Sequence, residues 1–137
     1  MELQRELDLP ISSESLIPLR SFLVRCLEEG GIATDARRAL MAGLDEALCA
    51  ALVGKSEDRR RGILTVSIDI NSTRVRVVLK DESDGAELSE RPEEGLLQLA
   101  SRPHQEMGLT LLRRVMDEIH YHYRRGFQNE LELIKFL

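Results

Sequence analysis

Three short motifs carry the residue types that could do chemistry in this sequence. Asp45 and Glu46 lie within a helical pattern, the motif DESDG at 81–85 ends a strand pattern, and Gly108 opens a further helical pattern. Carboxylates can act as bases or hydrogen-bond acceptors, and a glycine at a helix N-terminus lets backbone amides face an anion. The motifs therefore predict a site if the fold brings all three to one face of the molecule.

The composition limits the class of protein that could hold these motifs. The chain has 137 residues, 42% of them hydrophobic and 31% charged, which predicts one globular domain over residues 1–137. The formal net charge of −5 gives no electrostatic reason to expect nucleic acid or an anionic membrane as a direct partner. No apolar run reaches the roughly 18 residues of a membrane helix, and the N-terminus lacks a signal-peptide pattern, so we expect a cytoplasmic protein.

Hydrophobic periodicity predicts the element order β-α-α-β-β-loop-α-β-β. Apolar residues at helical spacing predict three helices, which begin near 11–14, at 34 or 35, and at 107. Alternating polarity predicts five strands, over 2–9, 64–70, 75–79, 119–124 and 131–133. Gly30-Gly31 is expected to end the first helix, Asn71-Ser72 to turn the first hairpin, and the segment 81–104 to be irregular.

This order predicts an α+β fold, a two-layer α/β sandwich. The sheet is expected to be mixed but mostly antiparallel and to be covered by helices on one face. Leucines repeat every four residues along the second helix, at Leu40, Leu44, Leu48 and Leu52, so that helix has one apolar side for the sheet. Cys26 and Cys49 lie in helical patterns without metal-type spacing and are expected to be buried, reduced thiols.

The order and spacing of these motifs resemble the anti-sigma-factor serine kinases of the GHKL superfamily, the histidine-kinase-like ATPases with the Bergerat ATP-binding fold. The resemblance covers almost the whole chain. Its matching stretches are 16–27, LDEALCAAL at 44–52, DESDG at 81–85, MGLTLLRRVMDEI at 107–119 and NELELIKFL at 129–137.

The resemblance implies a role for each motif. Glu46 would activate the nucleophile or water, Asp81 would read the adenine amino group, and Gly85 would let the backbone approach the ring. The helix N-terminus at Gly108, Leu109 and Thr110 would meet the phosphates. ATP is the cofactor that this implies, with Mg²⁺ only where ATP binds.

Several positions depart from the family pattern. Ala50 stands where the family has a magnesium-binding asparagine, and a methyl group cannot coordinate a hard cation. Ser83 replaces the first glycine of the strand-end motif, and Glu106 replaces the first glycine of the helix motif. Between residues 81 and 94 the only base among many acids is Arg91, which disfavours an anionic triphosphate. We therefore expect ATP binding to be weak or lost.

Two functions remain open. The first is a bacterial partner-switching regulator that binds a sigma factor or related target and exchanges it for a STAS-type antagonist, with homodimer formation implied by the resemblance. The second is an active ATP-dependent serine kinase that phosphorylates the antagonist, with Asp45 or water replacing the missing metal ligand. A detached ATPase domain of a histidine kinase is a third and less favoured interpretation.

Each motif also has a purely structural explanation. These are a solvated helix residue at Glu46, a turn former at Asp81 and a packing glycine at Gly108. His120 and His122 share a strand face and could be metal ligands, but without a third candidate a solvated sheet face is favoured. The basic triplet 59–61 is a solvated loop or a surface for an acidic partner.

Overall fold

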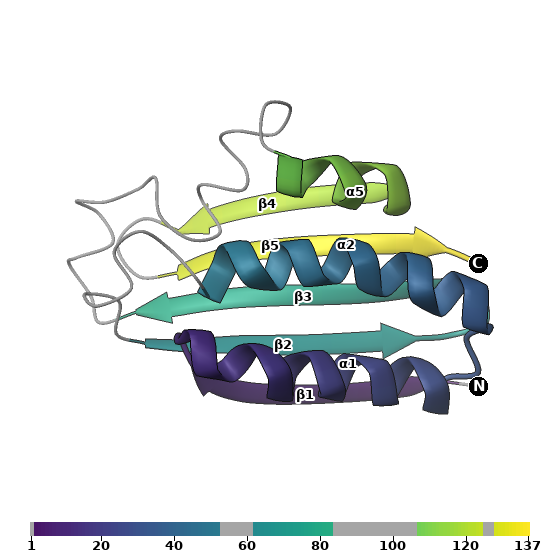
Figure 1. Cartoon of the computed structure of the whole chain (residues 1–137), viewed down its shortest axis with the longest axis horizontal. Helices are drawn as coiled ribbons and strands as arrows, with labels where there is room; N and C mark the ends of the chain where they lie inside the picture. Colours follow the sequence, from purple (N-terminus) through teal and green to yellow (C-terminus); the bar gives the residue numbers. More distant parts are fainter. Residues whose placement is uncertain (1, 53–61, 84–106, 125–127) are drawn as a thin grey trace.

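The computed structural model describes residues 2–52, 62–83, 107–124 and 128–137. Its helices are a short 3-10 helix (Ser13–Ser15), α1 (Leu16–Glu29), α2 (Thr34–Leu52) and α5 (Met107–Val115). Its strands are β1 (Leu3–Pro10), β2 (Gly62–Ile70), β3 (Arg74–Ser83), β4 (Glu118–Arg124) and β5 (Gln128–Phe136). The described helices and strands follow the predicted order (Figure 1). The expectation of an irregular segment over 81–104 is wrong for 81–83, which pair as the end of β3, and the rest of that segment lies outside the described residues.

The strands form one five-stranded sheet in the order β1-β2-β3-β5-β4. Every neighbouring pair of described strands is antiparallel, so the expected mixed sheet is corrected to an antiparallel one. The reason lies in the path of the chain. Strands β3 and β4, which come before and after α5, run in the same direction (Figure 1). They are not neighbours, because β5 lies between them and pairs antiparallel with both.

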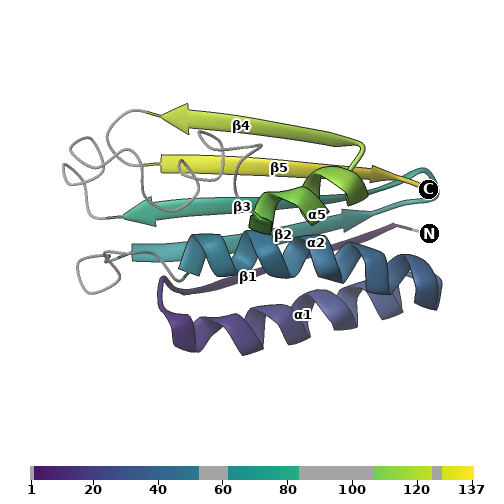
Figure 2. The same cartoon turned by 45° about the horizontal axis from the view of Figure 1, so that its top comes forward.

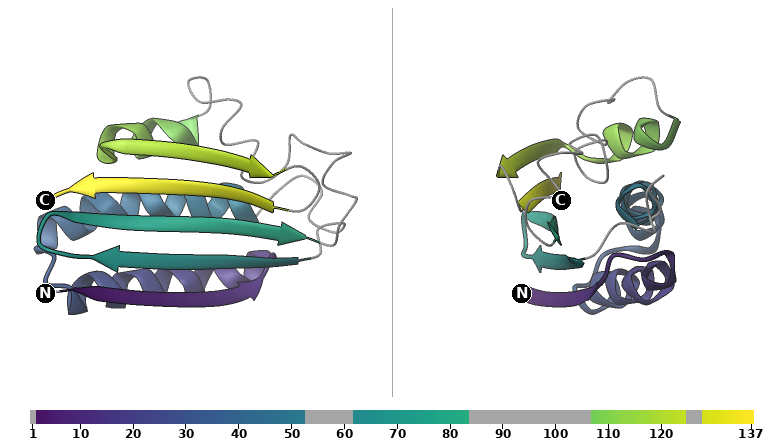
Figure 3. Two further views of the ribbon diagram at one scale, coloured as in Figure 1. Left: turned by 180° about the vertical axis from the view of Figure 1, so that it is seen from behind. Right: turned by 90° about the vertical axis from the view of Figure 1, so that its left-hand side faces the viewer.

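The molecule has two layers, which confirms the predicted sandwich. All of the helices described lie on one face of the sheet, and the other face is left uncovered by them (Figure 3). Alternate strand residues point into the layer between sheet and helices, where Leu64, Val66 and Ile68 are fully buried. They meet the leucine stripe of α2, whose members Leu40, Leu44, Leu48 and Leu52 are each at most 1% exposed.

The predicted breaks between elements have identifiable local causes. Gly31, the second residue after α1, adopts a positive φ of 77°, a conformation that glycine adopts without steric cost. A Cβ on Gly30 would lie 2.6 Å from Cδ1 of Ile70, so glycine lets the end of α1 approach β2. At the first hairpin, the Asn71 side-chain oxygen accepts hydrogen bonds from the backbone N–H groups of Thr73 (2.9 Å) and Arg74 (3.0 Å).

The two thiols differ in their surroundings. Both are free, but Cys26 is buried and Cys49 is exposed, so the expectation of two buried thiols is wrong for Cys49. The cause is the rotation of α2, because the buried stripe of Leu40, Leu44, Leu48 and Leu52 faces the sheet and Cys49 lies about 100° around the helix axis from Leu48.

Replacement of Leu48 by alanine tests this packing. Leu48 is 0% exposed between α2 and the sheet, so Leu48→Ala is expected to lower the free energy of unfolding by about 2–5 kcal/mol. The neighbouring exposed residue supplies a matched control, and Cys49→Ala is expected to change stability by less than about 0.5 kcal/mol. Urea denaturation measures both, and a larger loss for Cys49→Ala than for Leu48→Ala would mean that α2 faces the other way.

Candidate functional site

Glu46 connects two helices of the covering layer. Helix α2 lies between α1 and α5 (Figure 2) and packs against both. Oε1 of the half-buried Glu46 accepts a hydrogen bond of 3.1 Å from the backbone N–H of Leu112 in α5. Gly43 lies one turn earlier, and a Cβ there would be 3.4 Å from the Cα of Leu112. A side chain larger than alanine at position 43 would therefore separate the helices that Glu46 joins.

The surroundings of Glu46 make it a stronger base than a solvated glutamate. Burial is the main cause and raises the pKa of Glu46 above its ordinary value of 4.5. Hydrogen bonds from the backbone N–H groups of Leu112 and Leu111 act in the opposite direction and are outweighed. A carboxylate with a raised pKa is suited to taking a proton, although here its oxygen already accepts a bond from α5.

Asp45 faces the other neighbouring helix. Its Oδ2 lies 3.0 Å from Nε of Arg20 in α1 and forms an ion pair with it. Consecutive residues of a helix are separated by about 100°, so Asp45 and Glu46 are directed to opposite neighbours of α2. Asp45 is thus paired with α1. The kinase hypothesis would instead require its carboxylate to bind a metal ion beside Glu46.

Asp81 is a buried carboxylate on the helix-covered face of the sheet. It is 1% exposed, and in β3 its register partners are Leu64 of β2 and Asn129 of β5. Aspartate is rarely buried to this extent unless it serves a partner or ligand. A buried acceptor beneath the helices suits the adenine contact that the resemblance implies, whereas an exposed turn former would not be placed there.

The motifs point to one side of the molecule. Figure 1 shows that α2 and β3 both end on the side toward which the N-terminus of α5 points. Helix α5 begins at Met107, so Gly108, Leu109 and Thr110 occupy its first turn, as expected for a helix that opens there. Gly85, Glu106, the segment 84–106 and the basic triplet 59–61 lie outside the described residues. The assigned roles of the site residues stay predictions.

The magnesium position of the resembled family is apolar here. Ala50 lies one helical turn after Glu46, is half-buried and packs against the hydrophobic core. It offers no oxygen to a cation, so this position does not fit magnesium, whereas buried Asp81 fits a purine amino group. On the strand face predicted to be solvated, His120 and His122 are exposed, and Nε2 of His120 lies 3.0 Å from Oε1 of Glu118.

Comparison with known families agrees with this geometry. The sequence model of the histidine kinase-like ATPase domain matches residues 9–135. The chain belongs to this family. No curated protein sequence matches it. In the part of the chain that the structure describes, no helix is long and apolar enough to cross a membrane.

Two contacts of this family member could not be found from its motifs. The bond from Leu112 to Glu46 uses a backbone N–H, which every residue except proline has and which leaves no mark in the sequence. The Arg20–Asp45 ion pair joins two helices, and its two residues are separated by 25 positions in the sequence, so no local motif contains both. Gly43 inside a helical pattern was the one available signal of a close approach by another element.

Replacement of Glu46 by glutamine tests its electrostatic state. Because the folded pKa of Glu46 is raised, this group makes folding less favourable as pH rises above 4.5 through the folded pKa. Glutamine keeps an acceptor oxygen for Leu112 and carries no charge. Glu46→Gln is therefore expected to be at least as stable as the unaltered protein at pH 7, with the difference shrinking as the pH falls through the folded pKa and vanishing below pH 4.5.

Urea denaturation between pH 4 and pH 7 measures this effect. Glu2→Gln is the matched control, because Glu2 is exposed and precedes β1. If Glu46→Gln lost more than about 1 kcal/mol at pH 7, the charged hydrogen bond to α5 would outweigh the burial of Glu46.

Proposed function

We propose that this histidine kinase-like ATPase domain is a cytoplasmic regulator that acts by binding protein partners rather than by efficient catalysis. Its target would be a sigma factor or a related protein, exchanged for a STAS-type antagonist, and the protein would act as a homodimer. Family membership supports a kinase- or ATPase-type regulator. The partners come from the resemblance to the anti-sigma-factor kinases.

The observation that carries this proposal is the apolar contact at Ala50. Glu46 and Ala50 share one face of α2, but Ala50 packs against the core instead of presenting an oxygen. Asp45, the nearest alternative carboxylate, is held by Arg20 on α1. Magnesium prefers near-octahedral oxygen coordination, so neither residue supports its binding beside Glu46.

The adenine side of the site is better preserved than the metal side. Asp81 keeps a buried carboxylate at the position that the resemblance assigns to adenine recognition. Weak nucleotide binding that does not depend on magnesium is compatible with this pattern, and tight binding of Mg-ATP is not.

Calorimetric titration of ATP with and without Mg²⁺ tests the proposal. The unaltered protein is expected to bind weakly or not at all and to respond little to Mg²⁺. Ala50→Asn restores an oxygen one turn after Glu46 and should introduce a dependence on Mg²⁺. Asp81→Asn should remove any residual binding, whereas Cys49→Ala, an exposed change on the same helix, should have no effect.

Submicromolar binding of Mg-ATP by the unaltered protein, roughly −8 kcal/mol or better, would contradict the proposal. The second candidate function would then apply, an active serine kinase for the antagonist. The raised pKa of Glu46 is the observation that favours it, because burial makes this carboxylate a better base. Transfer of labelled phosphate to a serine of a STAS-domain protein, lost in Glu46→Gln, would establish it.

A further inference from the structure

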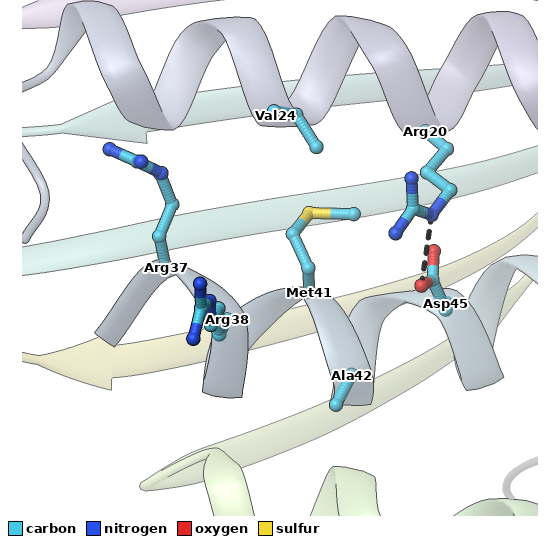
Figure 4. Close-up of a pocket in the computed structure, with 7 residues that line it drawn as sticks. All are labelled: Arg20, Val24, Arg37, Arg38, Met41, Ala42 and Asp45. Carbon is cyan, nitrogen blue, oxygen red and sulfur yellow. Dashed lines mark hydrogen bonds and ion pairs between the residues drawn. The ribbon is translucent and has the colours of Figure 1, made fainter. Parts of the chain in front are cut away.

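A groove separates the exposed sides of α1 and α2. Its volume is about 420 Å³, and both helices contribute side chains that face it (Figure 4). The lining residues are Arg20 and Val24 from α1 and Arg37, Arg38, Met41, Ala42 and Asp45 from α2. Of these residues, Asp45 alone belongs to a motif that the resemblance assigns to the nucleotide site, and its carboxylate is paired with Arg20 of α1.

The groove is basic in an otherwise acidic protein. Three arginines and one aspartate line it, whereas the whole chain carries a net charge of −5. Arg37 donates a hydrogen bond of 3.2 Å to the carbonyl of Ile32 and lies 3.9 Å from an exposed Glu28. Arg38 is exposed and forms no ion pair with any residue in the described segments. Its charge is therefore available to an anionic ligand.

The floor of the groove is apolar. Met41 is 6% exposed and extends between the two helices, below the half-buried Val24 (Figure 4). Methionine is flexible and adapts its shape to the groups that contact it. An apolar floor between basic rims matches an amphipathic helix that carries acidic residues beside a hydrophobic stripe.

Within the groove, the carboxylate of Asp45 already forms an ion pair with one of the arginines. Its Oδ2 pairs with Arg20 at 3.0 Å, and its Oδ1 is buried without a hydrogen-bond partner in the described structure. The pair is only partly shielded, since the side chains are 53% and 32% exposed. Exposed pairs of this kind contribute about 0–1 kcal/mol, so a carboxylate from another molecule can compete for Arg20.

We propose that this groove binds an acidic amphipathic helix of a protein partner, which competes with Asp45 for Arg20 and pairs with Arg38. The inference rests on the proposed function, because it supplies the surface that a partner-binding regulator needs. A polyphosphate would gain nothing from the apolar floor. Nucleic acid would also meet the net negative charge of the chain.

Fluorescence anisotropy with a defined peptide tests the groove. The probe is a fluorescein-labelled synthetic helix with a leucine stripe flanked by glutamates, and its comparison peptide has glutamine at every glutamate position. Binding of the acidic peptide should weaken with added salt, and Arg38→Glu should weaken it by about tenfold. Asp45→Asn should strengthen it by about threefold, because Arg20 loses its internal partner.

Arg25→Glu is the matched control. Arg25 is exposed on α1, and five residues of helix place it about 140° around the axis from Arg20. It should bind the peptide as the unaltered protein does, and thermal unfolding should confirm that all variants are folded. Equal losses for Arg25→Glu and Arg38→Glu would mean that only overall charge matters.

Other outcomes would overturn the proposal. These are no measurable binding of the acidic peptide, equal binding of the glutamine peptide, or tighter binding of duplex DNA or tripolyphosphate that also depends on Arg38. The titrations contain no nucleotide, so they are independent of the ATP measurements. Tight Mg-ATP binding together with groove-dependent peptide binding would remove the proposed function and leave the groove in place.

Discussion

Four leucines fix the rotation of helix α2 on the sheet, and the positions of the charged groups follow from that rotation. Leu40, Leu44, Leu48 and Leu52 form one stripe, and each is at most 1% exposed. Turning the helix by one residue would bury Asp45 or Cys49 against apolar strands and expose leucine, at a cost of several kcal/mol. Asp45 is therefore held toward α1 and Glu46 toward α5.

This division explains why the candidate nucleotide site and the groove lie on different sides of the same helix. Glu46 and Ala50 share the side near α5, where the alanine joins the core. Asp45 and Met41 share the side near α1, where they line the groove. A substitution at position 50 can therefore weaken a cation site and leave the groove unchanged, which is the condition for keeping partner binding after catalysis has been lost.

Patterns that arise from one element could be predicted, and contacts between elements could not. The alternation in 64–70 and the Asn71-Ser72 turn report directly on local structure, and both were found from the sequence. The insertion of β5 between β3 and β4 was not found, because strand order depends on pairing between distant segments. The hydrogen bond from Leu112 to Glu46 could not be predicted for the same reason. The motif at Asp81 could be recognised in the sequence, but the burial of its carboxylate could not.

The distribution of paired charges favours the helix layer over the open sheet face for partner binding. On the open face, Arg76 is hydrogen-bonded to both Asp69 and Glu132, and this contact with Arg76 lowers the pKa of Glu132. Lys80 lies 3.9 Å from Glu130 on the neighbouring strand. A ligand there would have to displace pairs that already satisfy one another. In the groove, Arg38 has no such partner among the described residues and Arg20 has only a half-exposed one, so a carboxylate gains contacts without first breaking a network.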